Sequence, residues 1–538
     1  MRKLHGLLIA VAIGALLTGC TQPAPNPTTG SGSAAVAPTL YMEGPATIVQ
    51  NYNPFGPGDK GPGLTYIYDA LVRIDHQHPE APIKPWLAES WAFNADGTQL
   101  TVHLRNDVTF SDGTPLTAAD VVYTLSVPLN HPELNAWGGS YTSVVAPDDH
   151  TVVLTYPTTA YGQLATLANA PIVQKAQWAS QDVTTFTNPA PVGSGLLTLD
   201  KIMPTAATFN VRTDWWRGQS AVQRVEMVAY AADTFKLQLQ RNELQWSGAA
   251  WPTAQQEYVS ADPKNHQAVI VAHGGAESLM FNSNKAPFND VHARRAIADS
   301  IDIARLSEIS GLPAPSPCGF TASRYADSVL IPACQGGAIR KVDAAAAKAE
   351  LAAGGWTVEG GNLVKDGQSI TVAFAYPVSW TSAEPIYRDI KTQLSENLGL
   401  NITLLTPPGD QYDAAVEEAH AALRFTAGAA GMLDAFRWMG NANNMGGWDD
   451  ARTTSLVAQM SATNPADPQY VALGLQLQQI VYDDVPYIPT VSGNWSILIN
   501  STSWTGWPTD PSTADYLATP YVAPSAEVIM LGLKPTGK

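Results

Sequence analysis

The stretch at residues 100–125 constrains the fold more than any other part of this sequence. Its first half alternates apolar with polar residues, and the apolar ones are Leu100, Val102 and Leu104. This alternation predicts a strand with one buried face. In the second half, Asp120 follows Thr117 at the capping-box spacing that opens a helix. A chain that changes from strand to helix over so short a distance is neither all-helical nor all-strand.

The same alternation of elements continues along the chain. We expect further strands at residues 151–156 and 401–405. Helices are expected after Asp290, after Asp302, from Asp343 to the stop at Gly354 and Gly355, and over Arg388–Leu398. Interleaved strands and helices predict an α/β fold of the mixed α+β kind, with several sheets.

Length and charge set further limits. A chain of 538 residues exceeds the size at which a single hydrophobic core keeps growing, so we expect two or more lobes. Its formal net charge of −17 at pH 7 argues against nucleic acid as a partner, because an acidic surface repels phosphate backbones.

The amino-terminal segment has the pattern of an export signal. A basic start is followed by the apolar run Leu7–Leu17, which is shorter than the roughly 20 residues that a transmembrane helix needs. The run ends in Leu-Thr-Gly-Cys at Cys20, which resembles a bacterial lipobox. The resemblance implies cleavage before Cys20 and acylation of its thiol.

We therefore expect residues 1–19 to be a signal peptide and residues 20–38 to be a lipid-anchored flexible tether on the extracytoplasmic face of the cell membrane. An ordinary signal ending in a chance cysteine is the alternative. The remaining cysteines, Cys318 and Cys334, are expected to form one disulfide outside the cytosol. A reactive thiol or a metal-binding pair is the alternative interpretation.

The sequence contains none of the common catalytic motifs. No G-x-S-x-G, H-E-x-x-H or Walker A pattern occurs. His76 and His78 could hold a metal from one side of a strand, but a site needs more than two ligands. A solvated loop is the simpler interpretation. We therefore expect neither enzymatic activity nor a cofactor or metal.

Five blocks of the sequence follow one another in an order that resembles family 5 of the bacterial solute-binding proteins. They are residues 87–125, 191–204, 278–302, 342–356 and 479–493. The third block contains FNSNKAPFNDVHARRA, which is similar to the family pattern F-N-x-x-x-x-P-F-x-D-x-x-V-R-x-A. The members of this family are receptors of ABC importers for peptides and some other solutes.

This resemblance implies a two-lobed clamp with a ligand cleft between the lobes and an extra domain on the first lobe. Carried onto this chain, the first lobe with its inserted domain covers residues 39–270 and the second covers residues 271–495. Residues 496–538 would return to the first lobe. The lobes of such clamps close around a bound ligand, and the closed form distinguishes the occupied receptor from the empty one.

The resemblance leaves two classes of ligand open. Peptide receptors of the family often hold the peptide amine with an acidic residue; Asp434 is the nearest candidate here, although its surroundings lack the usual motif. Residues 51–58 and 241–252 resemble a subset of members that bind β-linked oligosaccharides. Aromatic faces stack on sugar rings, and amides hydrogen-bond hydroxyl groups.

The candidate ligand-binding residues are Tyr52, Asn53, Trp246, Trp251, Asp434, Trp438 and Trp448. Tyr52, Trp246 and Trp448 are expected to line the cleft, because they lie in Gly- and Asn-rich segments without helical periodicity. For the four tryptophans, packing in the core or near the hinge is an equal alternative.

We predict a monomeric, lipid-anchored receptor that captures short oligopeptides and delivers them to the membrane permease of an ABC importer. The same role for short cello- or xylo-oligosaccharides is the alternative. A metal-chelate receptor resting on His76 and His78, and a surface hydrolase, are more remote.

Overall fold

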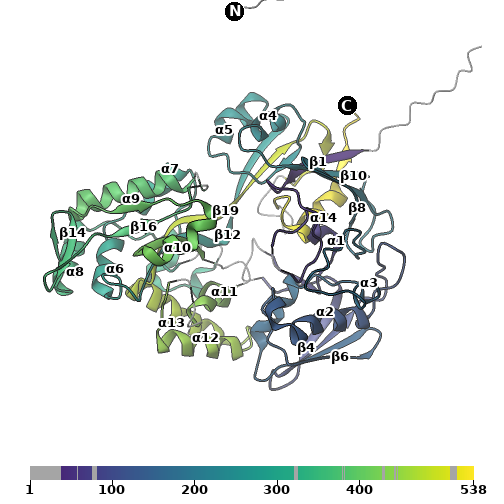
Figure 1. The fold of residues 1–538 in the computed structure, drawn as a ribbon, viewed down its shortest axis with the longest axis horizontal. Coiled ribbons are helices and arrows are strands. Elements are labelled where there is room, and N and C mark those ends of the chain that lie inside the picture. The colour runs from purple at the N-terminus through teal and green to yellow at the C-terminus, as the bar shows by residue number, and fades with distance from the viewer. Residues whose placement is uncertain are drawn as a thin grey trace, which may run out of the picture. The chain divides into compact units, whose positions relative to one another are not determined.

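A mixed sheet of ten strands runs through the described residues (Figure 1). The structure is a computed structural model that describes residues 38–56, 58–75, 81–319, 325–378, 380, 382–426, 431–440, 444, 446–508 and 518–537. In spatial order the strands are β17 (Thr403–Leu405), β16 (Ala373–Ala375), β18 (Ala421–Thr426), β12 (His266–Phe281), β19 (Tyr487–Asn500), β11 (Trp246–Ser247), β1 (Thr39–Gly44), β10 (Arg224–Ala229), β9 (Ala206–Val211) and β8 (Leu197–Met203).

The two longest strands of the sheet, β12 and β19, contribute side chains to the hydrophobic cores of both lobes. They pair antiparallel along almost their whole length, with two register shifts in the middle. In β12, Val271 packs in one core and Leu279 in the other. In β19, Ile497 and Ile488 divide between the cores in the same way. The chain thus passes between two lobes through this strand pair, which we call the hinge strands.

The first lobe joins the beginning and the end of the described chain. Its core contains Leu40 and Met42 of β1 together with Met530 of helix α14 (Ala523–Gly532). A four-stranded antiparallel sheet with helix α2 (Ala118–Asn130) continues this core without a break. Its strands are β4 (Ala88–Phe93), β5 (Gln99–Leu104), β7 (Thr151–Thr155) and β6 (Ser143–Asp148).

The second lobe has helices on both faces of its strands (Figure 1). On one face lie α6 (Val291–Ala298), α7 (Ile303–Ser310), α8 (Ala344–Ala353) and α9 (Ala383–Leu398). On the other lie α11 (Met432–Phe436), α12 (Ala451–Ala462) and α13 (Pro468–Asp484). Leu279 of β12 packs toward the first set and its neighbour Met280 toward the second, as the two-residue period of a strand requires.

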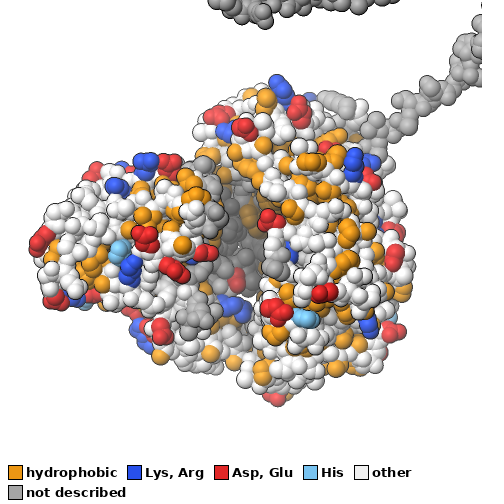
Figure 2. All heavy atoms as spheres, viewed as in Figure 1, with side chains coloured by type: hydrophobic (Ala, Val, Ile, Leu, Met, Phe, Trp, Pro, Cys, Tyr) orange, Lys and Arg blue, Asp and Glu red, His pale blue; other side chains and the backbone are white. Residues whose placement is uncertain are grey.

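Shorter elements connect and cover these layers. They are α1 (Leu64–Ile67), α3 (Lys175–Trp178), α4 (Phe235–Gln240), α5 (Ala254–Glu257), α10 (Tyr412–Glu418), β2 (Val72–Arg73), β3 (Lys84–Pro85), β13 (Thr357–Glu359), β14 (Asn362–Lys365), β15 (Gln368–Ile370), β20 (Trp504–Thr505) and β21 (Lys534–Pro535). Lys, Arg, Asp and Glu side chains are interspersed over the face seen in Figure 2, with no large basic patch on it.

The expected α/β fold of mixed type is confirmed, and so are most of its predicted elements. Helix α2 begins after Thr117, whose backbone N–H donates to the Asp120 carboxylate at 3.0 Å. The expected caps Asp290, Asp302 and Asp343 accept backbone N–H groups at the starts of α6, α7 and α8.

Two predicted elements start at different residues in the structure, and the strand predicted at residues 151–156 ends one residue earlier, at Thr155. Helix α9 starts at Ala383 and not at Arg388. Pro385 lies in its first turn, where backbone N–H groups have no partner within the helix, so the missing N–H of proline does not prevent the earlier start. Strand β17 starts at Thr403, two residues later than the sequence pattern predicts.

The predicted domain boundaries at residues 270/271 and 495/496 fall inside the hinge strands. Cys318 and Cys334 are joined by a disulfide, with their Cα atoms 6.1 Å apart. The predicted signal peptide, most of the predicted tether with Cys20, and the pair His76 and His78 lie outside the described residues. Within the described part of the chain, no helix is both long and apolar enough to cross a membrane.

Helix α14 carries a carboxyl group into the first-lobe core. Glu527 is fully buried; one of its oxygens accepts the Leu196 N–H at 3.3 Å, and the other has no hydrogen-bond partner among the described residues. Burial raises the pKa of Glu527 well above its usual value, and the nearby Asp69 carboxylate raises it further. The folded protein therefore holds this proton to a higher pH than the unfolded chain does.

We expect Glu527→Gln to increase the free energy of unfolding near pH 7.5. Because the folded-state pKa is raised, stability from this group is complete below the unfolded value of 4.5 and falls as the pH rises. The loss is about 1.4 kcal/mol per pH unit until the folded-state pKa is reached. Glutamine does not ionise and keeps an acceptor for Leu196.

Urea unfolding of both proteins at about pH 5.5 and about pH 7.5 measures this difference. The difference in free energy of unfolding between Glu527→Gln and wild type should increase as the pH rises. The exposed Glu359→Gln variant is the control and should show no such trend. An advantage that stays constant or shrinks with pH would contradict the interpretation of Glu527.

Candidate ligand-binding site

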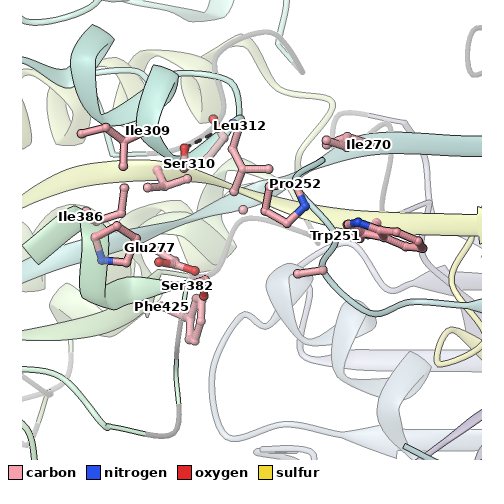
Figure 3. Close-up of a pocket in the computed structure, with 16 residues that line it drawn as sticks. Trp251, Pro252, Ile270, Glu277, Ile309, Ser310, Leu312, Ser382, Ile386 and Phe425 are labelled. Atoms are coloured by element: carbon pink, nitrogen blue, oxygen red, sulfur yellow. Dashed lines mark hydrogen bonds between the residues drawn. The ribbon is translucent and has the colours of Figure 1, made fainter. Parts of the chain in front are cut away.

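A cavity of about 380 Å³ lies against the hinge strands and takes its walls from both lobes (Figure 3). Its volume lies within the range of roughly 300–1,000 Å³ that is typical of small-molecule sites. Ile270 and Glu277 of β12 and Val491 and Ser496 of β19 contribute to its lining. A ligand bound here would touch segments on either side of the hinge, so we take this cavity as the candidate site.

The first-lobe wall is positioned by a buried carboxylate, Glu43 at the end of β1. The Ala249 N–H donates to this carboxylate at 3.2 Å, and the hydroxyl groups of Ser247 and Tyr521 also donate to it. Burial raises the pKa of Glu43 to about 7. These bonds join β1, the segment after β11 and the carboxyl-terminal part of the chain, and so fix the backbone that leads to the wall at residues 250–252.

Trp251 forms the aromatic part of that wall. Its indole N–H donates to the Glu257 carboxylate at 2.9 Å, and the Lys236 ammonium lies 4.7 Å from the ring centroid. The ring of Tyr258 packs against it with centroids 5.3 Å apart. Trp251 is only 4% exposed, so it presents a rigid edge to the cavity.

The second-lobe wall combines the end of α7, the start of α9 and the end of β18. Ile309, Leu312, Ile386 and Phe425 supply its apolar surface (Figure 3). Three of the large apolar side chains that are most exposed in the described chain border the cavity: Ile270 at 42%, Ile309 at 40% and Phe425 at 48%. Exposed apolar groups that converge on one hollow mark a binding surface more often than a packing fault.

Glu277 is the single charged residue among the 16 described residues that line the cavity. Its side chain is partly buried, and burial raises the pKa of its carboxyl group above the usual value. It shares a strand face with Leu279, which places it on the α7 and α9 side of the sheet.

The structure gives Tyr52 and Asn53, both predicted ligand contacts, a packing role in the first lobe. Tyr52 is fully buried and its hydroxyl donates to the Pro62 carbonyl at 3.1 Å. The Asn53 amide donates to the Val183 carbonyl at 2.7 Å. The Gly- and Asn-rich sequence around them reflects a tight buried turn, and neither residue lines the cavity at the hinge.

Trp246 and Trp448, also expected in the cleft, lie in two separate cores. Trp246 is fully buried, and its indole N–H donates to the Ala518 carbonyl at 3.2 Å. Trp448 is 6% exposed, and its indole N–H donates to the Thr453 hydroxyl at 3.1 Å. The Arg294 guanidinium lies 5.2 Å from the Trp448 ring. Both side chains are packed inside hydrophobic cores in this structure.

Trp438 and Asp434 occupy the other face of the second lobe. Trp438 is partly buried with its ring centroid 5.4 Å from that of Tyr487, and Asp434 lies in the first turn of α11. Neither borders the cavity at the hinge. Of the seven predicted contacts, Trp251 alone does so.

Sequence reasoning overlooked Glu277, Ile309 and Phe425. A signal for Glu277 was present, because it is an isolated acidic residue in a strand of small and apolar neighbours. Ile309 and Phe425 had no such signal, since their exposure depends on where the helix and the strand end relative to the hinge.

A second hollow of about 500 Å³ lies between the four-stranded sheet of the first lobe and helices α11 to α13. Trp91, Tyr161, Arg437 and Tyr470 contribute to its walls. The Arg437 guanidinium donates to the Gly162 carbonyl at 3.3 Å, which links the two lobes away from the hinge strands.

The amino-acid sequence of this chain is similar to that of a known protein family. Residues 82–450 match the bacterial extracellular solute-binding proteins, family 5. Heme-binding protein A of Haemophilus influenzae is 28% identical over 49% of this chain and 53% of its own length. The peptide transport periplasmic protein SapA of Salmonella typhimurium is 28% identical over 57% of this chain and 60% of its own length. The chain thus spans somewhat over half the length of these relatives.

Solved structures show the same fold. The periplasmic oligopeptide-binding protein of an oligopeptide ABC transporter from Thermotoga maritima superposes with a TM-score of 0.80 at 20% identity, over 93% of this chain and 99% of that one. A structure of the same protein with bound mannohexaose gives a TM-score of 0.74, also at 20% identity and over the same 93% and 99% of the two chains. This chain belongs to family 5 of the bacterial extracellular solute-binding proteins, as its sequence blocks indicated.

We predict that Trp251→Ala and Trp246→Ala separate binding from packing. Both tryptophans are buried and come from one segment, but only Trp251 borders the cavity. Each truncation should cost about 3–5 kcal/mol of stability. Trp251→Ala should also weaken ligand binding about thirty-fold, the cost of losing an anchor worth about 2 kcal/mol.

Calorimetric titration of the folded variants, with urea unfolding in parallel, measures both quantities. Trp246→Ala should bind ligand with the wild-type dissociation constant once its folded fraction is taken into account. Equal losses of affinity in the two variants would show that the cavity at the hinge is not the site.

Proposed function

We propose that this protein captures short peptides outside the cytoplasm and delivers them to the membrane permease of an ABC importer. Membership of family 5 supports a role in solute capture. The names of a relative, a peptide transport protein, and of a structural neighbour, an oligopeptide-binding protein, support peptides as the ligand class. Binding and release, without covalent chemistry, would be the whole activity.

The observation that carries this proposal is the cavity across the hinge strands. Trp251 and Pro252 approach it from the first lobe, and Ile309 and Phe425 approach it from the second (Figure 3). A ligand that touches both walls gains more contacts when the lobes close than when they are open. Its differential affinity therefore shifts the population toward the closed form, which a permease can recognise.

The lining of the cavity suits peptides better than neutral sugars. Its apolar surface is mostly aliphatic, from Ile270, Ile309, Leu312 and Ile386, and such side chains pack well against the apolar side chains of a peptide. Sugar sites instead rely on aromatic faces and on many polar groups.

Oligosaccharides remain the second candidate. The observation in their favour is the mannohexaose bound to the Thermotoga maritima structural neighbour. Trp251 and Phe425 are the aromatic side chains in the described lining that could contact a sugar ring.

Attachment to the membrane through Cys20 is part of the same proposal. The lipobox-like end of the export signal, with the Pro-, Gly- and Ser-rich residues 20–38 after it, supports a receptor tethered near its permease. A segment rich in Pro, Gly and Ser has too few apolar residues to build a core, so a tether of this composition would leave the lobes free to close.

Thermal unfolding in the presence of defined ligands tests the ligand class. A panel of tri- to pentapeptides, mannohexaose, cello- and xylo-oligosaccharides, heme and Ni²⁺ covers the classes named above. At one hundred times its dissociation constant a true ligand stabilises the protein by about 2.7 kcal/mol. We expect stabilisation by peptides with apolar side chains. Stabilisation by sugars, heme or Ni²⁺ and not by any peptide would contradict the proposal.

A further inference from the structure

The Glu277 carboxylate lies in the cavity without a partner of opposite charge. Within the described residues no ion pair includes it, and no side-chain hydrogen bond to it occurs, although its backbone carbonyl accepts the Thr490 hydroxyl at 3.0 Å. Ile386, Ser382 and Phe425 lie around it in Figure 3. A carboxylate held among apolar groups is costly unless a cation or several donors satisfy it.

The arginine side chains of the neighbouring elements are already paired. Arg305 of α7 pairs with Asp389, Arg388 of α9 with Glu384 at 2.7 Å, and Arg424 of β18 with Asp413 at 3.4 Å. Lys391 of α9 is exposed to solvent and is not among the lining residues. The buried phenol of Tyr387 feels the Glu277 charge, which helps to raise the pKa of Tyr387 above its usual value, so the phenol is neutral at physiological pH. The described chain therefore supplies no cation for this carboxylate.

Two features allow an ionised Glu277 to persist in the cavity. Helix α9 starts at the cavity, where Ser382 and Pro385 are lining residues, and the positive end of a helix dipole favours a negative charge nearby. The cavity also opens to water, which solvates the carboxylate when no ligand is present. A ligand that displaces this water must replace its hydrogen bonds.

We propose that Glu277 determines ligand specificity by binding a protonated primary amine, whose adjoining apolar group packs against Ile270, Ile309 and Phe425. This inference rests on the proposed function, because it assigns the chemical class of solute that the hinge cavity selects. The amine can be the amino terminus of a peptide or the ammonium of a lysine side chain. Neutral oligosaccharides offer no such group.

The apolar surroundings make this contact selective. A charge-assisted hydrogen bond gains strength where water is excluded, and an uncharged group in the same place leaves the carboxylate unsatisfied. Removing either charge should therefore weaken binding by about 10- to 100-fold. Removing both charges should weaken binding no more than removing one of them, because the carboxylate and the amine act as a pair.

The test is a cycle that changes the carboxylate and the amine separately. Wild type, Glu277→Gln and the control Glu308→Gln are titrated calorimetrically with Phe-Leu-Ala, N-acetyl-Phe-Leu-Ala and N-acetyl-Phe-Lys-Ala. Glu308 is exposed on α7 next to Ile309 but is not among the lining residues, so its variant removes a nearby charge without changing the cavity. Melting temperatures confirm that the variants are folded.

We expect wild type and Glu308→Gln to bind Phe-Leu-Ala and to lose about 10- to 100-fold in affinity on acetylation. Glu277→Gln should bind both forms with the same reduced affinity. Recovery of affinity with N-acetyl-Phe-Lys-Ala would show that the site also accepts the ammonium of a lysine side chain, and failure to recover would show that it requires the amino terminus.

Two outcomes would overturn the inference. One is equal affinity of wild type for the free and the acetylated peptide. The other is an unchanged effect of acetylation in Glu277→Gln. Both leave the proposed peptide function standing, because peptide binding itself is still observed.

If wild type binds no peptide, the proposed function fails and the inference is tested separately with 2-phenylethylamine and its uncharged analogue 2-phenylethanol. Preference for the amine in wild type, and its loss in Glu277→Gln, would support a cation site. Equal binding of the two compounds, or binding of neither, would overturn it.

Discussion

The pairing of β12 with β19 is the interaction on which the rest of this structure depends. Each strand contributes side chains to both hydrophobic cores, so the ladder between them joins two lobes that each have their own interior. Two paired strands can twist at modest cost, whereas the cores on either side resist deformation because they are close-packed. Any movement of one lobe relative to the other would therefore occur at the hinge strands. A ligand in the cavity beside them would contact both lobes and so favour one of their arrangements.

Three glutamate carboxyl groups show that one side-chain type has different roles in this fold. Glu527 is enclosed in a core, and burial raises the pKa of its carboxyl group well above the usual value. Glu43 is buried but accepts three hydrogen bonds, which fix the segment leading to Trp251. Glu277 is partly buried, its carboxylate has no ion pair or hydrogen bond among the described residues, and it lines a cavity. The environment, and not the residue type, separates a packing role from a binding role.

The sequence predicted the fold far better than the site. Periodicity and capping residues such as Thr117 and Asp290 act locally, so the starts of α2 and α6 could be found without tertiary information. Burial is not local. Tyr52 and Trp246 lie in loop-like sequence yet are fully buried. Tyr52 is covered by a turn that brings back Pro62, and Trp246 is covered by a segment 272 residues away at Ala518. The cavity lining is likewise assembled from segments far apart in the chain.

The central claim is that a ligand in the hinge cavity closes the two lobes. Lys201 in β8 and Glu359 in β13 are both exposed and lie on opposite lobes. Spin labels attached at these two positions allow the distance between the lobes to be measured by pulsed electron–electron double resonance. A saturating peptide that binds by calorimetry should shift the distance distribution to shorter values and narrow it. An unchanged distribution in the presence of that bound peptide would contradict the account.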